Sequence, residues 1–321
     1  MSVEPLTLPT LAEIESAAEL IRPQIPPTPT YTWPLLNEAA GCEVWVKHEN
    51  HTPVGAFKVR GGLVYLDELL KQQPDVPGII AASTGNHGQS IALAAQRRGV
   101  RAVIVVPHGN NPEKNNAMRA LGAELVEHGR EFQDALVYSK ELAKAQGLHA
   151  VPSFHPWLVR GVATYALEFF RAAGELDVVY VPIGLGSGAC GVIAAREALG
   201  FKTRIIGVVS AQAPAYALSF HQKKFITQPS MTRVAEGAAC STPNEMALDC
   251  LNRYLEDIVM ISDEEALVAM RELLTATHNL AEGAGAVSWA AIRKHREALR
   301  GQRVGCILSG GNASLALLRD I

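Results

Sequence analysis

Cysteine is scarce in this 321-residue sequence, and its five cysteines form no pattern. None of them is spaced Cys-x-x-Cys, which argues against a disulfide framework and against a thiolate zinc site. An odd number of scattered thiols is typical of a reducing compartment. We therefore predict a cytoplasmic protein.

Long apolar runs and blocks of one charge are also missing. No apolar run is long enough to span a bilayer, and the first residues lack the basic-then-apolar order of a secretion signal. The formal net charge is −3 without a basic cluster, so we expect neither a membrane nor a nucleic acid as partner. With 48% hydrophobic residues, the chain has ample core for one large or two ordinary domains.

Short apolar runs alternate with amphipathic segments along most of the chain. This alternation predicts the α/β class, with parallel strands covered by helices. Strands are predicted at 43–47, 78–82, 102–106, 123–126, 177–181, 205–209 and 304–308, and helices at 9–22, 63–70, 90–98, 112–121, 131–146, 159–172, 192–199 and 287–299.

One lysine stands out in the segment His51–Gly62. Small and turn-prone residues bring the backbone up to Lys58, which lies between Phe57 and Val59. Partial desolvation disfavours an ammonium and leaves an amine that can attack a carbonyl. A lone lysine is more often a surface residue on a loop, so the interpretation depends on the motifs that follow.

The first of these motifs is Ser83-Thr-Gly-Asn-His87, directly after a predicted strand and before a predicted helix. A strand, a polar glycine turn and a helix together direct free backbone N–H groups at an anion. Hydroxyl and amide side chains add donors, so a carboxylate is the expected ligand. The alternative is an ordinary helix cap, which Ser83 or Thr84 alone would provide.

The second motif is glycine-rich and follows the strand predicted at 177–181. In Gly184-Leu-Gly-Ser-Gly188 the backbone can curl so that N–H groups converge, which suits a phosphate. A dinucleotide turn would look similar. Against it, the strand at 205–209 leads into Ser210, where a ribose-binding acid is expected.

A last polar turn, Ser309-Gly-Gly-Asn312, follows the strand predicted at 304–308. In open α/β sheets, ligands bind at this edge. A lysine, a carboxylate site and a phosphate site are together what pyridoxal phosphate and an amino acid require.

These motifs resemble the serine/threonine dehydratase and serine racemase family, the fold-type II pyridoxal-phosphate enzymes. The likeness runs from about Thr30 to the C-terminus and rests on three motifs in the family's order: Gly55-Ala-Phe-Lys58-Val-Arg-Gly61, Ser83-Thr-Gly-Asn-His87 and Ser309-Gly-Gly-Asn312. It implies a tryptophan synthase β-like fold of two three-layer αβα domains around mostly parallel twisted sheets. Residues 1–77 and 153–321 would form the large domain that binds pyridoxal phosphate, and residues 78–152 the small one.

The resemblance also implies site roles. Lys58 would hold the cofactor covalently and take the Cα proton, with Thr84 as a second catalytic hydroxyl on the opposite face. The implied cofactor contacts are Phe57, Lys58, Asn86, Gly184, Leu185, Gly186, Ser187, Gly188 and Ser309. The implied substrate contacts are Ser83, Thr84, Asn86, His87, Ser153, Phe154 and His155.

The implied activity is that of an ammonia-lyase, a carbon–oxygen lyase that dehydrates a β-hydroxy-α-amino acid to a 2-oxo acid and ammonia. A neutral Ser309 at the pyridine nitrogen would favour elimination over transamination. Threonine or serine is the expected substrate type, and a bulkier one such as hydroxyaspartate or phenylserine is possible because Phe154-His155 replaces the family's acidic pair. Alternatives are a racemase, a β-replacement enzyme and, less favoured, a non-catalytic amino-acid-binding protein.

The sequence departs from the family pattern in two further places. Leu185 and Ser187 interrupt the usual run of glycines in the phosphate loop. Val209 and Ala215 stand where many relatives carry metal-binding acids, so no metal site is expected. From the family we also expect a homodimer. The sequence stops soon after Asn312, which led us to expect no regulatory domain and a degradative, catabolic role.

Overall fold

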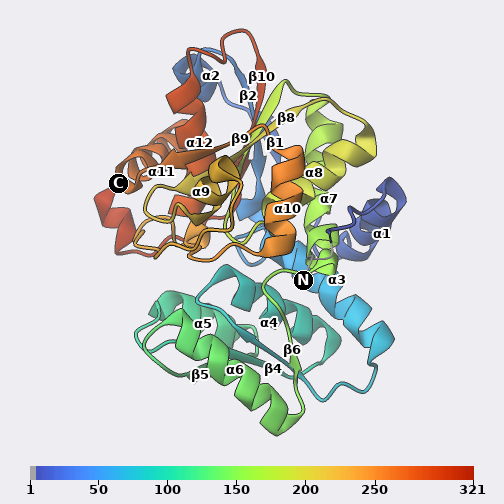
Figure 1. The fold of residues 1–321 in the computed structure, drawn as a ribbon. Helices are drawn as coiled ribbons and strands as arrows, with labels where there is room; N and C mark the ends of the chain where they lie inside the picture. Colours follow the sequence, from blue (N-terminus) through green and yellow to red (C-terminus); the bar gives the residue numbers. More distant parts are fainter. Residues whose placement is uncertain (1–4) are drawn as a thin grey trace.

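The computed structural model describes residues 5–321, so the first four residues of the predicted large domain lie outside it. Its strands form two separate sheets, one in the upper and one in the lower part of Figure 1. All pairs of strands are parallel except one. The predicted α/β class is confirmed.

The larger sheet has six strands in the order β1-β2-β10-β7-β8-β9. Only β1 runs antiparallel to its neighbour. Alternate side chains of each inner strand enter two different hydrophobic cores, as the period of two in a strand requires. The strands are β1 (Thr30–Thr32), β2 (Glu43–His48), β7 (Val178–Pro182), β8 (Arg204–Ser210), β9 (Asp257–Ile261) and β10 (Arg303–Leu308).

Helices cover both faces of this sheet, which gives three layers. One core contains α1 (Leu11–Ile21), α7 (Pro156–Ala173), α8 (Ser187–Leu199), α9 (Ala215–Gln222) and α10 (Glu245–Tyr254). The other contains α2 (Pro34–Ala40), α11 (Asp263–Thr277) and α12 (Gly283–His295). Three short 3₁₀ turns complete this part: η1 (Glu49–His51), η2 (Glu236–Ala238) and η3 (Leu317–Asp320).

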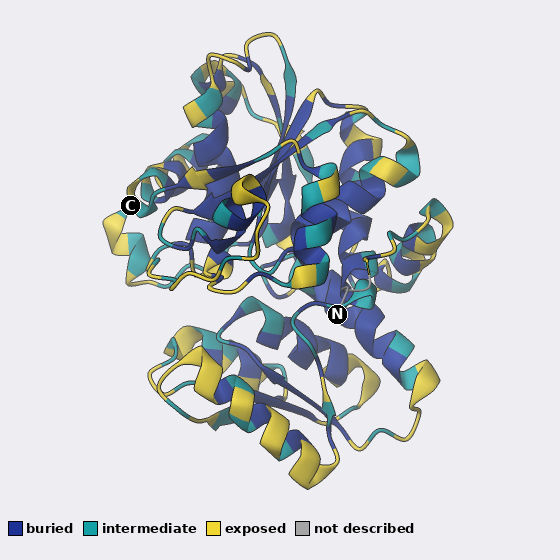
Figure 2. Ribbon diagram, viewed as in Figure 1, coloured by how far each residue is buried: buried dark blue, intermediate teal, exposed yellow. Residues whose placement is uncertain are grey.

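The smaller sheet has four parallel strands in the order β5-β4-β3-β6. They are β3 (Ile79–Ala82), β4 (Ala102–Val106), β5 (Glu124–Glu127) and β6 (His149–Ala150). One core joins the sheet to α3 (Lys58–Gln72), α4 (Asn86–Arg98) and α5 (Pro112–Ala120), and the other joins it to α6 (Phe132–Gln146). These strands lie within the predicted small domain, whose precise boundaries stay a prediction. The inner strands are buried and the outer face of α6 is exposed (Figure 2).

Five helices begin earlier than the apolar periodicity predicts: α7 at Pro156, and four helices whose first turns contain motif residues. α3 begins at Lys58 itself, α4 at Asn86, α8 at Ser187 and α12 at Gly283. Their first turns contain the glycines and polar residues of the motifs, which hid the helical pattern because glycine is a poor helix former. The motifs are therefore helix N-termini as well as loops, and each follows the carboxyl end of a strand or lies beside one.

Candidate active site

Lys58 is the first residue of α3, and the residues that directly follow β10 hold the backbone beside it. The N–H of Phe57 donates to the carbonyl of Ser309 at 3.1 Å, and Ala56 forms a β-bridge with Gly310. The Lys58 Nζ lies 4.9 Å from the centre of the Phe57 ring. Burial of the amine lowers the pKa of Lys58, against an opposing attraction from Glu282. The amine of Lys58 therefore loses its proton more easily than that of a surface lysine, and the deprotonated amine is nucleophilic.

The turn after β3 faces this lysine from the small sheet. Ser83 Oγ accepts from the N–H groups of Gly85 at 3.3 Å and Gly88 at 2.8 Å, so this hydroxyl holds the turn together as a cap would. Thr84, Asn86 and His87 stay partly exposed. The carboxylate site predicted for these residues is compatible with that arrangement and stays a prediction.

His87 is electrically neutral in this position. Burial is the main cause that lowers its pKa to about 3, and the charge of Lys58 lowers it further. The buried Nε2 of His87 has no hydrogen-bond partner in the described chain. A buried ring nitrogen without a partner beside a reactive lysine indicates a place for a ligand.

The glycine-rich loop forms the N-terminus of α8. Gly186 adopts φ +103°, a conformation that favours glycine, and no side chain caps the helix. From Gly184 onward, Cys190 is the first residue whose backbone N–H has an acceptor in the described chain. It donates to the carbonyl of Gly186 at 2.9 Å. The N–H groups before it are free to bind an anion.

Close backbone contacts hold this glycine loop in place. A Cβ at Gly184 would lie 2.3 Å from the carbonyl oxygen of Gly237, so only glycine fits there. The buried Tyr216 donates from its hydroxyl to the carbonyl of Leu185 at 2.8 Å, and Tyr165 does the same to Gly188 at 3.2 Å. Leu185 and Ser187 therefore interrupt the glycines without disturbing the free N–H groups.

Ser309 lies at the carboxyl end of β10, beside the start of α12. Its side chain is buried, and its Oγ donates to the carbonyl of Ala284 at 3.4 Å. This contact is long, so the hydroxyl can turn to another acceptor. The role predicted for Ser309 at a pyridine nitrogen stays a prediction.

Three polar residues join this cluster that sequence reasoning did not assign to the site: Lys114, Glu282 and Asn312. Glu282 accepts from Asn86 at 2.6 Å, and Asn312 donates to Asn86 at 2.8 Å. Lys114 Nζ lies 2.5 Å from a carboxylate oxygen of Glu236. The sequence signal that could have identified Glu282 is its position directly before Gly-Ala-Gly-Ala286, at the head of a helix.

Ser153, Phe154 and His155 occupy a different environment. Phe154 is buried in the core of the large sheet. His155 caps α7, accepting from the N–H of Trp157 at 3.2 Å, and its ring packs 5.2 Å from that of Tyr65. Phe154 and His155 therefore have structural roles. The part in substrate binding that we predict for Ser153, Phe154 and His155 stays a prediction.

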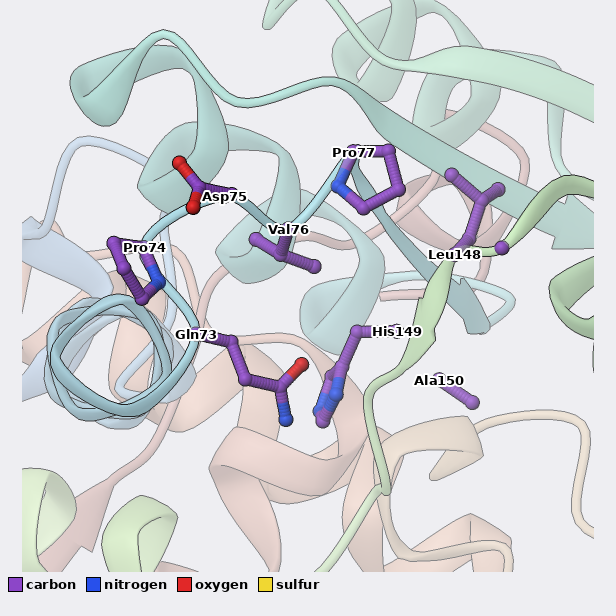
Figure 3. A pocket seen from close by; sticks show the side chains of 9 residues that line it. Gln73, Pro74, Asp75, Val76, Pro77, Leu148, His149 and Ala150 are labelled. Carbon is purple, nitrogen blue, oxygen red and sulfur yellow. The ribbon is translucent and has the colours of Figure 1, made fainter.

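Figure 3 shows a separate hollow of about 540 Å³ between the end of α3 and β6. It is lined by residues 73–77 and 147–150, which include none of the predicted site residues. The 15-residue helix α3 places it about 22 Å from Lys58. This hollow is thus distinct from the lysine site.

Two further features concern the predicted absences. Within residues 5–321, no three His, Cys, Asp or Glu side chains are grouped so that they could hold a metal ion. Over the same residues, no helix is both long and apolar enough to cross a bilayer. All five cysteines are buried and free.

Comparison with known proteins places the chain among enzymes. Residues 21–310 match the family described as pyridoxal-phosphate dependent enzyme. The chain is 31% identical to the biosynthetic L-threonine dehydratase of Haemophilus influenzae over 92% of its own length, yet it spans only 58% of that relative. It is also 31% identical to the catabolic L-threonine dehydratase of Staphylococcus aureus, covering all of this chain and 95% of that protein. The structure of maize serine racemase superposes with a TM-score of 0.91 at 25% identity, over 98% of this chain and 96% of that one.

The lysine site fits pyridoxal phosphate on its own geometry. Lys58 offers a desolvated amine for the aldehyde, and the start of α8 offers free N–H groups for the phosphate. The buried Nε2 of His87, near Lys58, has no hydrogen-bond partner in the described chain. Site, fold and sequence agree, and the chain belongs to the pyridoxal-phosphate dependent enzyme family.

Proposed function

We propose that this protein is an ammonia-lyase of the threonine/serine dehydratase type, acting on a β-hydroxy-α-amino acid. The observation that carries the proposal is the desolvated amine of Lys58, placed where the polar turn after β3, the start of α8 and Ser309 meet. The similarity to two threonine dehydratases at 31% identity supports the reaction class.

When bound, pyridoxal phosphate supplies an electron sink for negative charge at Cα. Lys58 takes the Cα proton, because its lowered pKa leaves the amine free to act as a base. The polar turn with Thr84 and the N-terminus of α4 orients the substrate carboxylate.

The overall reaction balances without an oxidant or a metal. The substrate loses its Cα proton and its β-hydroxyl as one water molecule. Hydrolysis of the remaining C–N bond consumes one water and gives a 2-oxo acid and ammonia. The neutral hydroxyl of Ser309 cannot supply a full negative charge near the pyridine nitrogen, which favours expulsion of the β-substituent over transamination.

The test is 2-oxo acid release from L-serine, L-threonine, 3-hydroxyaspartate and 3-phenylserine, each with its stereoisomers. We expect turnover of at least one, lost by a factor of 10³ or more, on the order of a missing catalytic base, in Lys58→Ala. Preference for a bulky member would support a pocket shaped by Phe154 and His155. A yellow protein that releases oxo acid from none of them contradicts the proposal.

Racemisation is the second candidate, and the hydroxyl of Thr84 favours it. Thr84 is partly exposed in the polar turn, and its hydroxyl has no hydrogen-bond partner in the described chain. Such a hydroxyl is free to return a proton to Cα, although its methyl group restricts the rotamers. Chiral chromatography after incubation in deuterated water distinguishes the two reactions, since only racemisation yields deuterated enantiomer without oxo acid.

We further propose a cytoplasmic homodimer with a catabolic role. The five buried free thiols support a reducing compartment. The match to a catabolic dehydratase along 95% of its length supports the degradative role. Light scattering of the purified protein tests the dimer, and a mass of one chain contradicts it.

A further inference from the structure

Asn86 joins the two sheets of the molecule through its side-chain amide. The residue begins α4 beside the small sheet, whereas both of its amide partners come from the large part of the fold. Its Nδ2 donates to Glu282 Oε1 at 2.6 Å, and its Oδ1 accepts from Asn312 Nδ2 at 2.8 Å. One N–H of Asn86 then remains without an acceptor in residues 5–321.

The direction of this amide is set by two groups that only accept. Asn312 also donates from Nδ2 to the backbone carbonyl of Val54 at 2.8 Å, so its amide nitrogen must face this side. A reversed Asn86 would bring its own oxygen against the Glu282 carboxylate and its nitrogen against a donor. The chain Val54–Asn312–Asn86–Glu282 therefore has one consistent polarity.

The Glu282 carboxyl occupies a space that glycine residues leave open. A Cβ at Gly310 would lie 2.6 Å from Glu282 Oε1, and one at Gly237 would lie 3.8 Å away. The residue is 8% exposed at the head of α12, and its side chain does not cap that helix. Its position thus serves Asn86 rather than its own helix.

Charged groups face this carboxyl from three elements. They are Lys58 on α3, Lys114 on α5 and Glu236 on η2. Burial is the largest effect and raises the pKa of Glu282, while Lys114 is the leading influence that lowers it. The Lys114 chain also lies on the polar turn, where a Cβ at Gly85 would meet its Cδ at 3.2 Å.

We propose that Glu282 and Asn312 are positioning residues that orient the Asn86 amide so that an N–H faces the cofactor, and that the Lys114 ammonium, which pairs with Glu236 beside the same turn, favours the carboxylate form of Glu282. Neither part depends on whether the substrate is dehydrated or racemised. Both depend on binding of the cofactor alone, so the experiments that test them use no substrate. These experiments can contradict the roles of Glu282, Asn312 and Lys114 while the dehydratase function holds, and the dehydratase function can fail while these roles hold.

The test follows the visible absorption band of the protein loaded with pyridoxal phosphate as the pH is varied. When Glu282 takes up a proton at low pH, its hydrogen bond with Asn86 changes, and with it the hydrogen bond that Asn86 gives to the cofactor. The absorption band should therefore change on the acid side. In Glu282→Gln, which keeps an acceptor and the packing, we expect this change to be absent. In Lys114→Met we expect it at higher pH than in the unmodified protein, because a cation that favours the carboxylate is gone.

Binding of pyridoxal phosphate to the cofactor-free protein gives a second, independent reading. Glu282→Ala leaves the Asn86 donor without its acceptor, and we expect affinity to fall about tenfold. The affinity of Glu282→Gln should stay within about threefold of that of the unmodified protein. A threefold change is about half the free-energy loss of a tenfold one. Melting curves of each variant establish that the protein is folded.

Lys140→Met is the matched control, since Lys140 is exposed on α6 of the same small domain. The proposal is overturned if Glu282→Gln and the unmodified protein titrate alike. It is equally overturned if Lys114→Met moves the band no more than Lys140→Met, or if neither Lys114→Met nor the unmodified protein shows any acid-side change.

Discussion

Burial decides the protonation of individual side chains in this protein. The pKa values of Lys58 and His87 are both lowered toward the neutral forms because burial removes water from these side chains. His48, at the end of β2, is in the same situation away from the polar turn. It is fully buried, and its Nε2 accepts from the indole N–H of Trp33 at 3.1 Å.

His48 should make the protein sensitive to acid. Burial is the main cause that lowers its pKa from 6.5 to about 4. Below pH 6.5 the unfolded chain therefore takes up this proton first, and the free energy of unfolding falls until about pH 4, by up to about 3 kcal/mol. Urea unfolding at several pH values measures this. His48→Gln should flatten that pH dependence, while the exposed His108→Gln should leave it unchanged; equal slopes in all three proteins would contradict the assignment.

At the scale of elements, the first turns of the helices carry the chemistry. Glycine costs helix stability, yet it lets these turns approach other backbone closely. The loop that leads into α8 shows the same close approach at Gly184, where the carbonyl of Gly237 leaves no room for a side chain.

Gly184→Ala should therefore displace the glycine loop and weaken binding of pyridoxal phosphate by at least about a hundredfold, the scale of an overpacked site. Ser187→Ala keeps the backbone and loses only one hydroxyl, so a decrease of about tenfold or less is expected. Equilibrium dialysis of the cofactor measures both. If Ser187→Ala is the more harmful change, the backbone N–H groups are not the main anion ligands.

A buried ionic network ties the first turn of α3 to its surroundings. Arg60, two residues after Lys58, donates to Glu49 at 2.7 Å and to Glu168 at 2.7 Å, and Lys47 also binds Glu168. Arg60, Glu49 and Lys47 are completely buried. Such a network fixes the geometry of the turn that carries the lysine.

Removing one member should leave an uncompensated charge. For Glu49→Ala we expect a loss of about 3–5 kcal/mol in the free energy of unfolding. Glu68→Ala, which removes a partly exposed partner of Lys71 and Arg160, should cost about 1 kcal/mol or less. Denaturant titration gives both values, and similar losses would show that the buried network contributes little.

For the whole molecule, α3 is the connection between the two sheets. Its glycines allow close contact on both sides: a Cβ at Gly61 would lie 2.9 Å from the carbonyl oxygen of Leu158 on α7, and one at Gly62 would lie 2.3 Å from Ser90 Oγ on α4. Ser90 also donates to the carbonyl of Lys58 at 2.7 Å. Helix α4 of the small sheet packs on the lysine-bearing helix through these contacts, and the two helices lie next to each other in Figure 1.

Gly62→Ala should separate α3 from α4 and cost about 1–3 kcal/mol of stability together with most of the activity. Adding Ser90→Ala removes the closest atom, but the Ser90 carbonyl remains 2.9 Å away, so we expect only partial recovery. Thermal unfolding and turnover of the single and double variants measure this. Full recovery in the double variant would show that the backbones do not determine the spacing.

The sequence by itself determined the α/β class, seven of the ten strands in residues 5–321 and the motifs around Lys58, Ser83 and Ser309. Those features are local: periodicity, turn residues and short motifs each depend on neighbours in the chain. Only the tertiary structure decided that Glu282 and Asn312 bind Asn86, because these contacts join residues 196 and 226 positions apart. It also decided where the helices begin, since packing against other backbone outweighs the low helix propensity of glycine in their first turns.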